Sequence, residues 1–167
     1  MNYDNFKAIL AKSNRRILLV GFLFLLIGAP ILVSNFIGNS QMAAWIISLL
    51  FILLGLLVII RSMNDLSKIK SDSLPLLKAI KQKQLDYVVW IYQKEITSKV
   101  EGVKVSKSNN IIVRSNDNKH FEIVLTKKTS PTEIITYLTT LFPKVYVGYS
   151  DEIKREVELQ LKNKTNR

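Results

Sequence analysis

The 167-residue chain contains no cysteine, and its only histidine is His120. Without cysteine it cannot form disulfides, bind metal through thiolates, use a thiol nucleophile or carry a lipoprotein or palmitoyl anchor. Gly102 and Gly148 stand alone, so no glycine-rich phosphate-binding loop is present. We therefore predict no catalytic, cofactor-binding or metal-binding residue.

Charge is also missing from one long segment. Residues 17–60 are 44 consecutive positions without Asp, Glu, Lys, Arg or His. As one helix they would measure about 66 Å, whereas the hydrocarbon core of a bilayer is about 30 Å thick. The segment therefore predicts an integral membrane protein with two transmembrane helices, at about 17–36 and 42–60, within a hairpin at 16–61.

The polar, uncharged residues 34–41 predict the turn between the two passes. Pro30 predicts a kink, or an early helix end, near residues 26–30. Two alternatives are weaker. Two buried helices of a soluble core would need more protein to cover them. A signal peptide at 1–33 lacks a convincing cleavage site.

Folding the hairpin about Gly38 brings together residues whose numbers sum to about 76. Small residues let transmembrane helices approach closely, so we predict a helix–helix seam. Arg15 comes level with Arg61, just outside the apolar segment. The predicted seam residues are Gly21, Gly28, Ser48 and Gly55.

Basic residues flank both passes, and the connecting turn has none. The positive-inside rule then places both termini in the cytoplasm, with the hairpin in the cell (inner) membrane. Residues 1–15 form a basic segment in which Tyr3, Phe6, Ile9 and Leu10 recur at helical spacing. This spacing predicts a short interfacial helix; the alternative is a frayed tail that only sets topology.

The net charge of +11 is spread along the parts of the chain that are predicted to be cytoplasmic, before and after the uncharged segment. Such a surface is attracted to anionic lipid. Nucleic acid, the other usual partner of a basic surface, is not expected, because no recognition motif accompanies the charge. The candidate contacts for lipid or an acidic partner are Arg15, Arg16, Arg61, Lys68, Lys70, Lys78, Lys81 and Lys83.

The residues after the hairpin, 61–167, number 107, which is enough for one small domain. Residues 62–86 predict a juxtamembrane connector and a helix that is capped by Asp72 or Ser73, has Pro75 in its first turn and ends near Leu85. Residues 87–162 then predict an α+β domain, and 163–167 a disordered tail.

Four consecutive strands are predicted first: 87–92 with a weaker continuation to 97, 103–105, 111–115 and 121–125, with polar turns at 106–110 and 116–118. Ser130-Pro-Thr-Glu133 then predicts a helix start. A short strand at 145–147 and a last helix capped by Ser150 follow. The predicted fold class is a membrane α-helical hairpin plus a cytoplasmic α+β domain with a mainly antiparallel sheet.

Few polar residues could carry chemistry. His120 has only Glu122 nearby on the same strand face, so a surface histidine is the simpler interpretation. Asp117, Asp151 and Glu152 occupy turn and cap positions that account for them. Trp90 lies in an apolar run and is predicted to be core. Trp45 is predicted to anchor at the outer membrane interface.

The two passes, the aromatic strand Val88-Val-Trp-Ile-Tyr92 and the later run Val147-Gly-Tyr-Ser-Asp-Glu152 resemble small bacterial two-transmembrane proteins of unknown function with a C-terminal α+β domain. That resemblance implies no known active residues. The arrangement of segments is also similar to bacterial pleckstrin-homology-like proteins, although their order of strands and helices differs.

The sequence thus favours a non-enzymatic interaction or scaffold module that is tethered to the membrane and binds a protein partner or itself. The alternative is a protein that binds anionic lipid headgroups or is regulated by lipid. An enzyme is the third class. No cofactor is expected.

Overall fold

The computed structural model describes residues 1–38, 42–100, 103–125 and 129–165, with side chains described outside 96–100, 103–108 and 164–165. The chain divides into two compact units. The hairpin unit is Ala11–Ser71. The α+β unit joins Met1–Leu10 to Asp72–Arg167.

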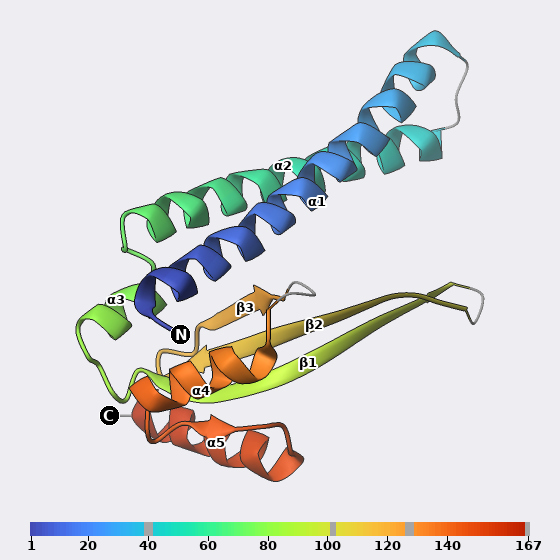
Figure 1. Ribbon diagram of the computed structural model, residues 1–167. Helices are drawn as coiled ribbons and strands as arrows, with labels where there is room; N and C mark the ends of the chain where they lie inside the picture. Colours follow the sequence, from blue (N-terminus) through green and yellow to red (C-terminus); the bar gives the residue numbers. More distant parts are fainter. Residues whose placement is uncertain (39–41, 101–102, 126–128, 166–167) are drawn as a thin grey trace. The chain divides into compact units, whose positions relative to one another are not determined.

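Two long helices build the hairpin unit: α1, Tyr3–Ile37, and α2, Met42–Lys70 (Figure 1). Both are long and apolar enough to cross a membrane. The predicted end of the first helix near Pro30 is wrong, because α1 continues through Pro30 to Ile37. Transmembrane helices tolerate an internal proline when neighbouring groups satisfy the freed carbonyl. Within the predicted turn at 34–41, Ser34 to Ile37 are helical. Residues 39–41 lie outside the described part.

The two helices pack through residues spaced seven apart. In α1 the buried positions include Asn14, Gly21, Gly28 and Asn35, and in α2 they are Ser48, Gly55, Ser62 and Ile69. A seven-residue interval keeps one stripe of each helix facing its partner. Large apolar side chains such as Leu19, Leu26 and Leu57 lie on the outside instead. The hairpin predicted from the uncharged segment is confirmed.

The α+β unit contains α3, Pro75–Lys81, and a sheet flanked by two further helices. The strands are β1, Val88–Val100; β2, Val103–Ser115; β3, His120–Val124; and β4, Tyr146–Val147; the helices are α4, Pro131–Leu141, and α5, Asp151–Thr165. The strand order is β3-β2-β1-β4 (Figure 1). β1, β2 and β3 pair antiparallel, and β4 is parallel to β1. The predicted α+β class with a mainly antiparallel sheet is confirmed.

The polar turn predicted at 106–110 is wrong. β2 runs unbroken through it, so one strand replaces two and three strands precede α4. Ser106 and Asn110 pair with Ser98 and Lys94 of β1. The ladder satisfies the backbone of these polar residues, so pairing with β1 outweighs the turn preference of their side chains.

Helix ends also differ from the sequence pattern. Leu74, not Asp72 or Ser73, is the N-cap of α3, which ends at Lys81 rather than near Leu85. Ser130 occupies the N-cap of α4 but makes no capping hydrogen bond with its side chain. The Ser150 hydroxyl does accept a bond from the Ile153 N–H, at 3.1 Å. The predicted disordered tail is wrong through residue 165, because α5 continues to Thr165.

Each face of the sheet has its own apolar layer. Ile91 and Val113 pair across β1 and β2 and are fully buried. Trp90 lies in a second cluster with Val157 and Leu161 of α5. Between Val88 and Trp90 the register shifts, leaving Val89 as an extra residue in β1. Trp90 is therefore core, as its apolar run predicts.

The first turns of α1 belong to the α+β unit. Phe6 is 0% exposed, and its ring lies 5.4 Å from that of Tyr137 on α4. Leu10 is also buried. The prediction of an interfacial helix is therefore wrong, since these apolar side chains bury against protein rather than lipid. Amphipathic spacing does not say which apolar surface covers it.

Candidate functional site

Asp72 is the centre of a polar cluster in the α+β unit. It follows α2 with φ at +54°, in the left-handed region that aspartate tolerates better than most residues. Its carboxylate accepts a hydrogen bond from the Tyr3 hydroxyl at 2.8 Å. It also forms ion pairs with Lys7 at 2.6 Å and Lys81 at 2.5 Å. The cluster thus joins the start of α1 to α3.

The cluster shifts the titration of two of its members. The Lys7 and Lys81 ammonium groups, followed by the Tyr3 hydroxyl, hold the pKa of Asp72 well below its usual range. Burial raises the pKa of Tyr3, and its hydrogen bond to Asp72 raises it further. Asp72 therefore stays ionised and Tyr3 neutral at ordinary pH. These protonation states indicate a structural clamp rather than an acid–base site.

The predicted basic contacts fall into both units. Arg15, Arg16 and Arg61 are exposed near one end of the uncharged segment of the hairpin unit. Lys68 and Lys70 lie in the last turn of α2. In the α+β unit Lys78 and Lys83 are exposed, whereas Lys81 is engaged by Asp72 and lies 5.5 Å from the centre of the Tyr3 ring. Lys81 is therefore shared between Asp72 and any lipid or partner that it could contact.

The predicted seam residues all lie on the buried stripe of the hairpin unit. A Cβ added at Gly55 would lie 2.9 Å from the Gly21 carbonyl oxygen, so these two backbones touch. Gly28 lies against Phe51 and Ile52 rather than directly on Ser48. Ser48 is fully buried, and its hydroxyl donates to the Trp45 carbonyl at 2.9 Å.

Sequence reasoning missed a further member of the same stripe. The Asn14 side-chain amide donates to the Ser62 carbonyl across the two helices at 3.4 Å. The residue numbers of Asn14 and Ser62 also sum to 76. Their spacing of seven residues from Gly21 and Gly55 was the sequence signal that could have predicted this contact.

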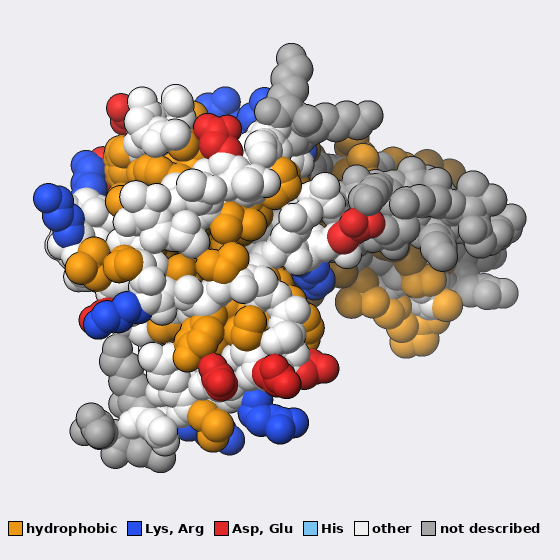
Figure 2. Space-filling model, turned by 60° about the horizontal axis from the view of Figure 1, so that its bottom comes forward, with side chains coloured by type: hydrophobic (Ala, Val, Ile, Leu, Met, Phe, Trp, Pro, Cys, Tyr) orange, Lys and Arg blue, Asp and Glu red, His pale blue; other side chains and the backbone are white. Residues whose placement is uncertain are grey.

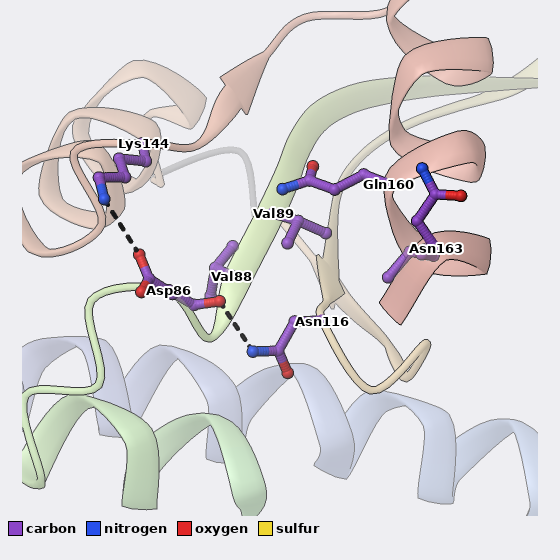
Figure 3. Close-up of a pocket in the computed structure, with 8 residues that line it drawn as sticks. Asp86, Val88, Val89, Asn116, Lys144, Gln160 and Asn163 are labelled. Atoms are coloured by element: carbon purple, nitrogen blue, oxygen red, sulfur yellow. Dashed lines mark hydrogen bonds and ion pairs between the residues drawn. The ribbon is translucent and has the colours of Figure 1, made fainter. Parts of the chain in front are cut away.

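A pocket of about 480 Å³ opens beside the start of β1 (Figure 3). Gln160 and Asn163 of α5 lie on one side of it, and Asp86, Asn116 and Lys144 provide further polar groups. Asn116 donates to the Asp86 carbonyl at 2.9 Å, and the Lys144 ammonium lies 3.9 Å from the Asp86 carboxylate. The lining contains no Ser, Cys or His. This pocket could hydrogen-bond a polar molecule, and the groups in its lining that could act as nucleophiles, the Lys144 amine and the Asp86 carboxylate, lie against each other.

Three aromatic rings gather where β4 meets α5. Tyr149 stacks on Trp90 with 5.6 Å between ring centroids, and Tyr92 lies 4.4 Å from Trp90. The Trp90 indole N–H donates to the Gly148 carbonyl at 2.7 Å. Gly148 has φ at +93°, a conformation that favours glycine, and so turns the chain from β4 toward Tyr149. No local pattern predicts this contact, because it joins residues far apart in the chain.

His120 and Glu122 do not form a joint site. The Glu122 carboxylate accepts a bond from the Asn110 amide at 2.6 Å. His120 is exposed at the surface. The partial loss of water around its ring lowers its pKa, and the positive charge of nearby Arg114 lowers it further. Asp117 pairs with Lys119 at 2.6 Å within its turn. Among the described residues no group of three His, Asp or Glu side chains could hold a metal ion.

The model of one family, described as a domain of unknown function (DUF6709), matches residues 79–157. The match begins within α3, covers all four strands and α4, and ends in α5. The chain is thus similar to this family over most of the α+β unit, and the hairpin lies outside the match. No curated protein and no solved structure matches the chain.

Proposed function

We propose that the chain is an interaction module, in which the hairpin tethers the α+β unit to the membrane and the α+β unit binds a protein partner or a second copy. The supporting observation is a set of exposed apolar and aromatic side chains around β4 and α5. Tyr146, Val147, Tyr149 and Leu159 are 36%, 46%, 57% and 56% exposed. Apolar groups that gather on a surface mark contact sites more often than scattered ones do.

Figure 2 shows the face that α5 presents. Hydrophobic side chains cross its middle, while acidic and basic side chains lie mostly toward its rim. An apolar centre with a charged rim is the usual anatomy of a protein–protein interface. The exposed side chains that gather here are apolar and aromatic, which favours binding over catalysis at this surface.

Site-specific photocrosslinking tests the proposal in native membranes. A photoreactive phenylalanine analogue replaces Tyr149, and the matched control carries it at Asp117 in the exposed β2–β3 turn. We expect a discrete protein adduct from position 149 and none from position 117. No adduct from either position, or the same adducts from both, would contradict the proposal.

The proposed orientation places both chain ends in the cytoplasm. Arg15, Arg16 and Arg61 lie just beyond the uncharged segment, and basic residues are retained on the cytoplasmic side. Because the chain has no natural cysteine, Asn2→Cys and Ser40→Cys can be labelled separately with a membrane-impermeant maleimide in intact cells. Labelling at 40 but not at 2 is expected; the reverse pattern would overturn this orientation.

Anionic lipid is a second candidate ligand, favoured by the exposed Arg15, Arg16 and Arg61 near one end of the hairpin. The test uses the whole chain in nanodiscs. A soluble fragment that begins after the hairpin, at residue 62, would lack Phe6, which is buried in the α+β unit. Anionic lipid should raise the melting temperature of the wild type relative to neutral lipid. The triple variant Arg15→Gln, Arg16→Gln, Arg61→Gln should lose this gain. Equal melting in both lipids would argue against lipid recognition.

A further inference from the structure

Four segments of the α+β unit meet at the pocket beside the start of β1 (Figure 3). Val88 and Val89 of β1 and Leu161 of α5 contribute apolar surface to its lining, and all three are buried. Its volume of about 480 Å³ lies within the range of small-molecule sites. Such sites combine apolar walls with a few polar groups that orient the ligand. The pocket therefore has the size and the apolar wall of a site for one small molecule.

Carboxamides make up most of the polar lining. Asn116 is already engaged, because its amide donates to the Asp86 carbonyl at 2.9 Å. Gln160 and Asn163 are exposed, and within the described part of the chain no hydrogen bond engages their carboxamides. Gln160 extends from α5 over Val89 (Figure 3). A carboxamide offers a donor and an acceptor in one plane, so these two can pair with a ligand that presents both side by side.

The charges of the lining narrow the class of ligand further. Asp86 and Lys144 are its charged members, and their groups lie 3.9 Å apart. Because one charge offsets the other, the pocket has no excess charge that would attract a polyphosphate or a metal ion. A neutral polar ligand therefore suits this lining better than a strongly charged one.

We propose that the pocket binds adenine as the base of a nucleoside. Asn and Gln side chains pair with the adjacent donor and acceptor on the edge of adenine, whereas Arg or Lys matches guanine and Asp or Glu matches cytosine. Here the Lys and the Asp of the lining lie against each other, and two carboxamides remain. The flat face of the base would lie on Val89 and Leu161, as bases held in enzyme pockets pack against apolar side chains.

Isothermal titration calorimetry of the full-length chain in detergent tests the class of ligand. Adenosine should bind at least five-fold more tightly than purine riboside, which lacks only the 6-amino donor. ATP should bind no more tightly than adenosine, because the lining has no excess positive charge. No binding of adenosine, equal binding of purine riboside, or tighter binding of ATP would overturn the inference.

Substitution of the free carboxamides tests the place of binding. Gln160→Leu and Asn163→Leu should each weaken adenosine binding at least five-fold. Both side chains are exposed, so the variants should melt as the wild type does in the absence of ligand. The matched control is Gln93→Leu, which removes an exposed glutamine of β1 outside the lining and should bind adenosine normally.

A covalent block provides a second measurement, because the chain has no natural cysteine. Alkylation of Asn163→Cys with a bulky maleimide should abolish adenosine binding, whereas alkylation of Gln93→Cys should leave it unchanged. Binding that survives both the carboxamide substitutions and the block at 163 would place adenosine elsewhere and overturn the inference.

This site is independent of the proposed function, since it takes a small molecule rather than a protein. If adenosine does not bind while the probe at Tyr149 captures a protein, only the adenine site fails.

Discussion

The two units bury opposite kinds of side chain. In the hairpin unit the buried stripe contains Gly21, Gly28, Ser48 and Gly55, and leucines lie outside. In the α+β unit most of the fully buried side chains are large and apolar, with Phe6 and Phe142 the largest and small residues such as Ser115 in the minority. Water drives apolar side chains inward, whereas lipid tails are as apolar as leucine and provide no such drive. Transmembrane helices then gain most from close backbone contact.

The two tryptophans provide a separate reporter for each unit, since Trp45 lies in the hairpin unit and Trp90 in the α+β unit. A Trp45→Phe background leaves Trp90 fluorescence to follow the α+β unit. A Trp90→Phe background leaves Trp45 to follow the hairpin unit. Each prediction below uses the background that matches the unit under test, with the full chain in detergent.

The largest effect should come from Phe6→Ala. Phe6 is fully buried in the α+β unit, and removing a buried phenylalanine costs about 3–5 kcal/mol of unfolding free energy. Denaturant unfolding followed by Trp90 measures the loss. The control, Phe22→Ala, removes a ring that is 47% exposed on the hairpin surface and should change little. Equal losses from both variants would mean that Phe6 is not part of the α+β core.

Next comes Gly55→Ala, which adds one methyl group where a Cβ would lie 2.9 Å from the Gly21 carbonyl oxygen. The clash is with backbone, so the helices must separate, at a cost of about 1–3 kcal/mol. Thermal unfolding followed by Trp45 should show a lower midpoint, and Gly55→Leu a larger drop.

Gly38→Ala is the matched control, since its Cβ would meet only an ordinary contact, 3.5 Å from the Ser34 carbonyl oxygen. Unchanged stability in Gly55→Ala, Gly55→Leu and Gly21→Leu would show that the hairpin does not depend on close helix contact.

The smallest effect should come from Asp72→Asn, which keeps the shape and tolerates positive φ but removes the charge shared with Lys7 and Lys81. The pKa of Asp72 is lowered in the folded chain, so its contribution is full above the unfolded pKa of about 3.9. It is lost as pH falls further, toward the folded pKa. The gap in melting temperature between wild type and variant should therefore be widest near neutral pH.

Asp86→Asn provides the comparison for Asp72→Asn, because Asp86 is exposed and lies 3.9 Å from Lys144. Exposed ion pairs contribute little, so this variant should melt almost as the wild type does. A gap for Asp72→Asn that did not change with pH would mean that its charge is not what stabilises the clamp.

Local patterns predicted the helices better than the strands. The Ser130-Pro-Thr-Glu133 start led to α4, and the cap at Ser150 led to α5. The polar stretch at 106–110 misled because strand pairing with distant residues satisfies its backbone. The candidate sites divide in the same way. The contact of Gly21 with Gly55 could be predicted from small residues spaced seven apart. The Asp72 cluster could not, because it joins residues 3, 7, 72 and 81, which are distant in the chain.

The sequence by itself determined the hairpin and the pairing of its helices. Both follow from local properties: an uncharged length that only two helices can accommodate, and small residues seven apart. Only the tertiary structure decided that residues 1–10 belong with the α+β unit, that β4 lies parallel to β1 and that Tyr149 stacks on Trp90. These features depend on contacts between segments distant in the chain, and a single sequence carries no local signal for which surfaces will meet.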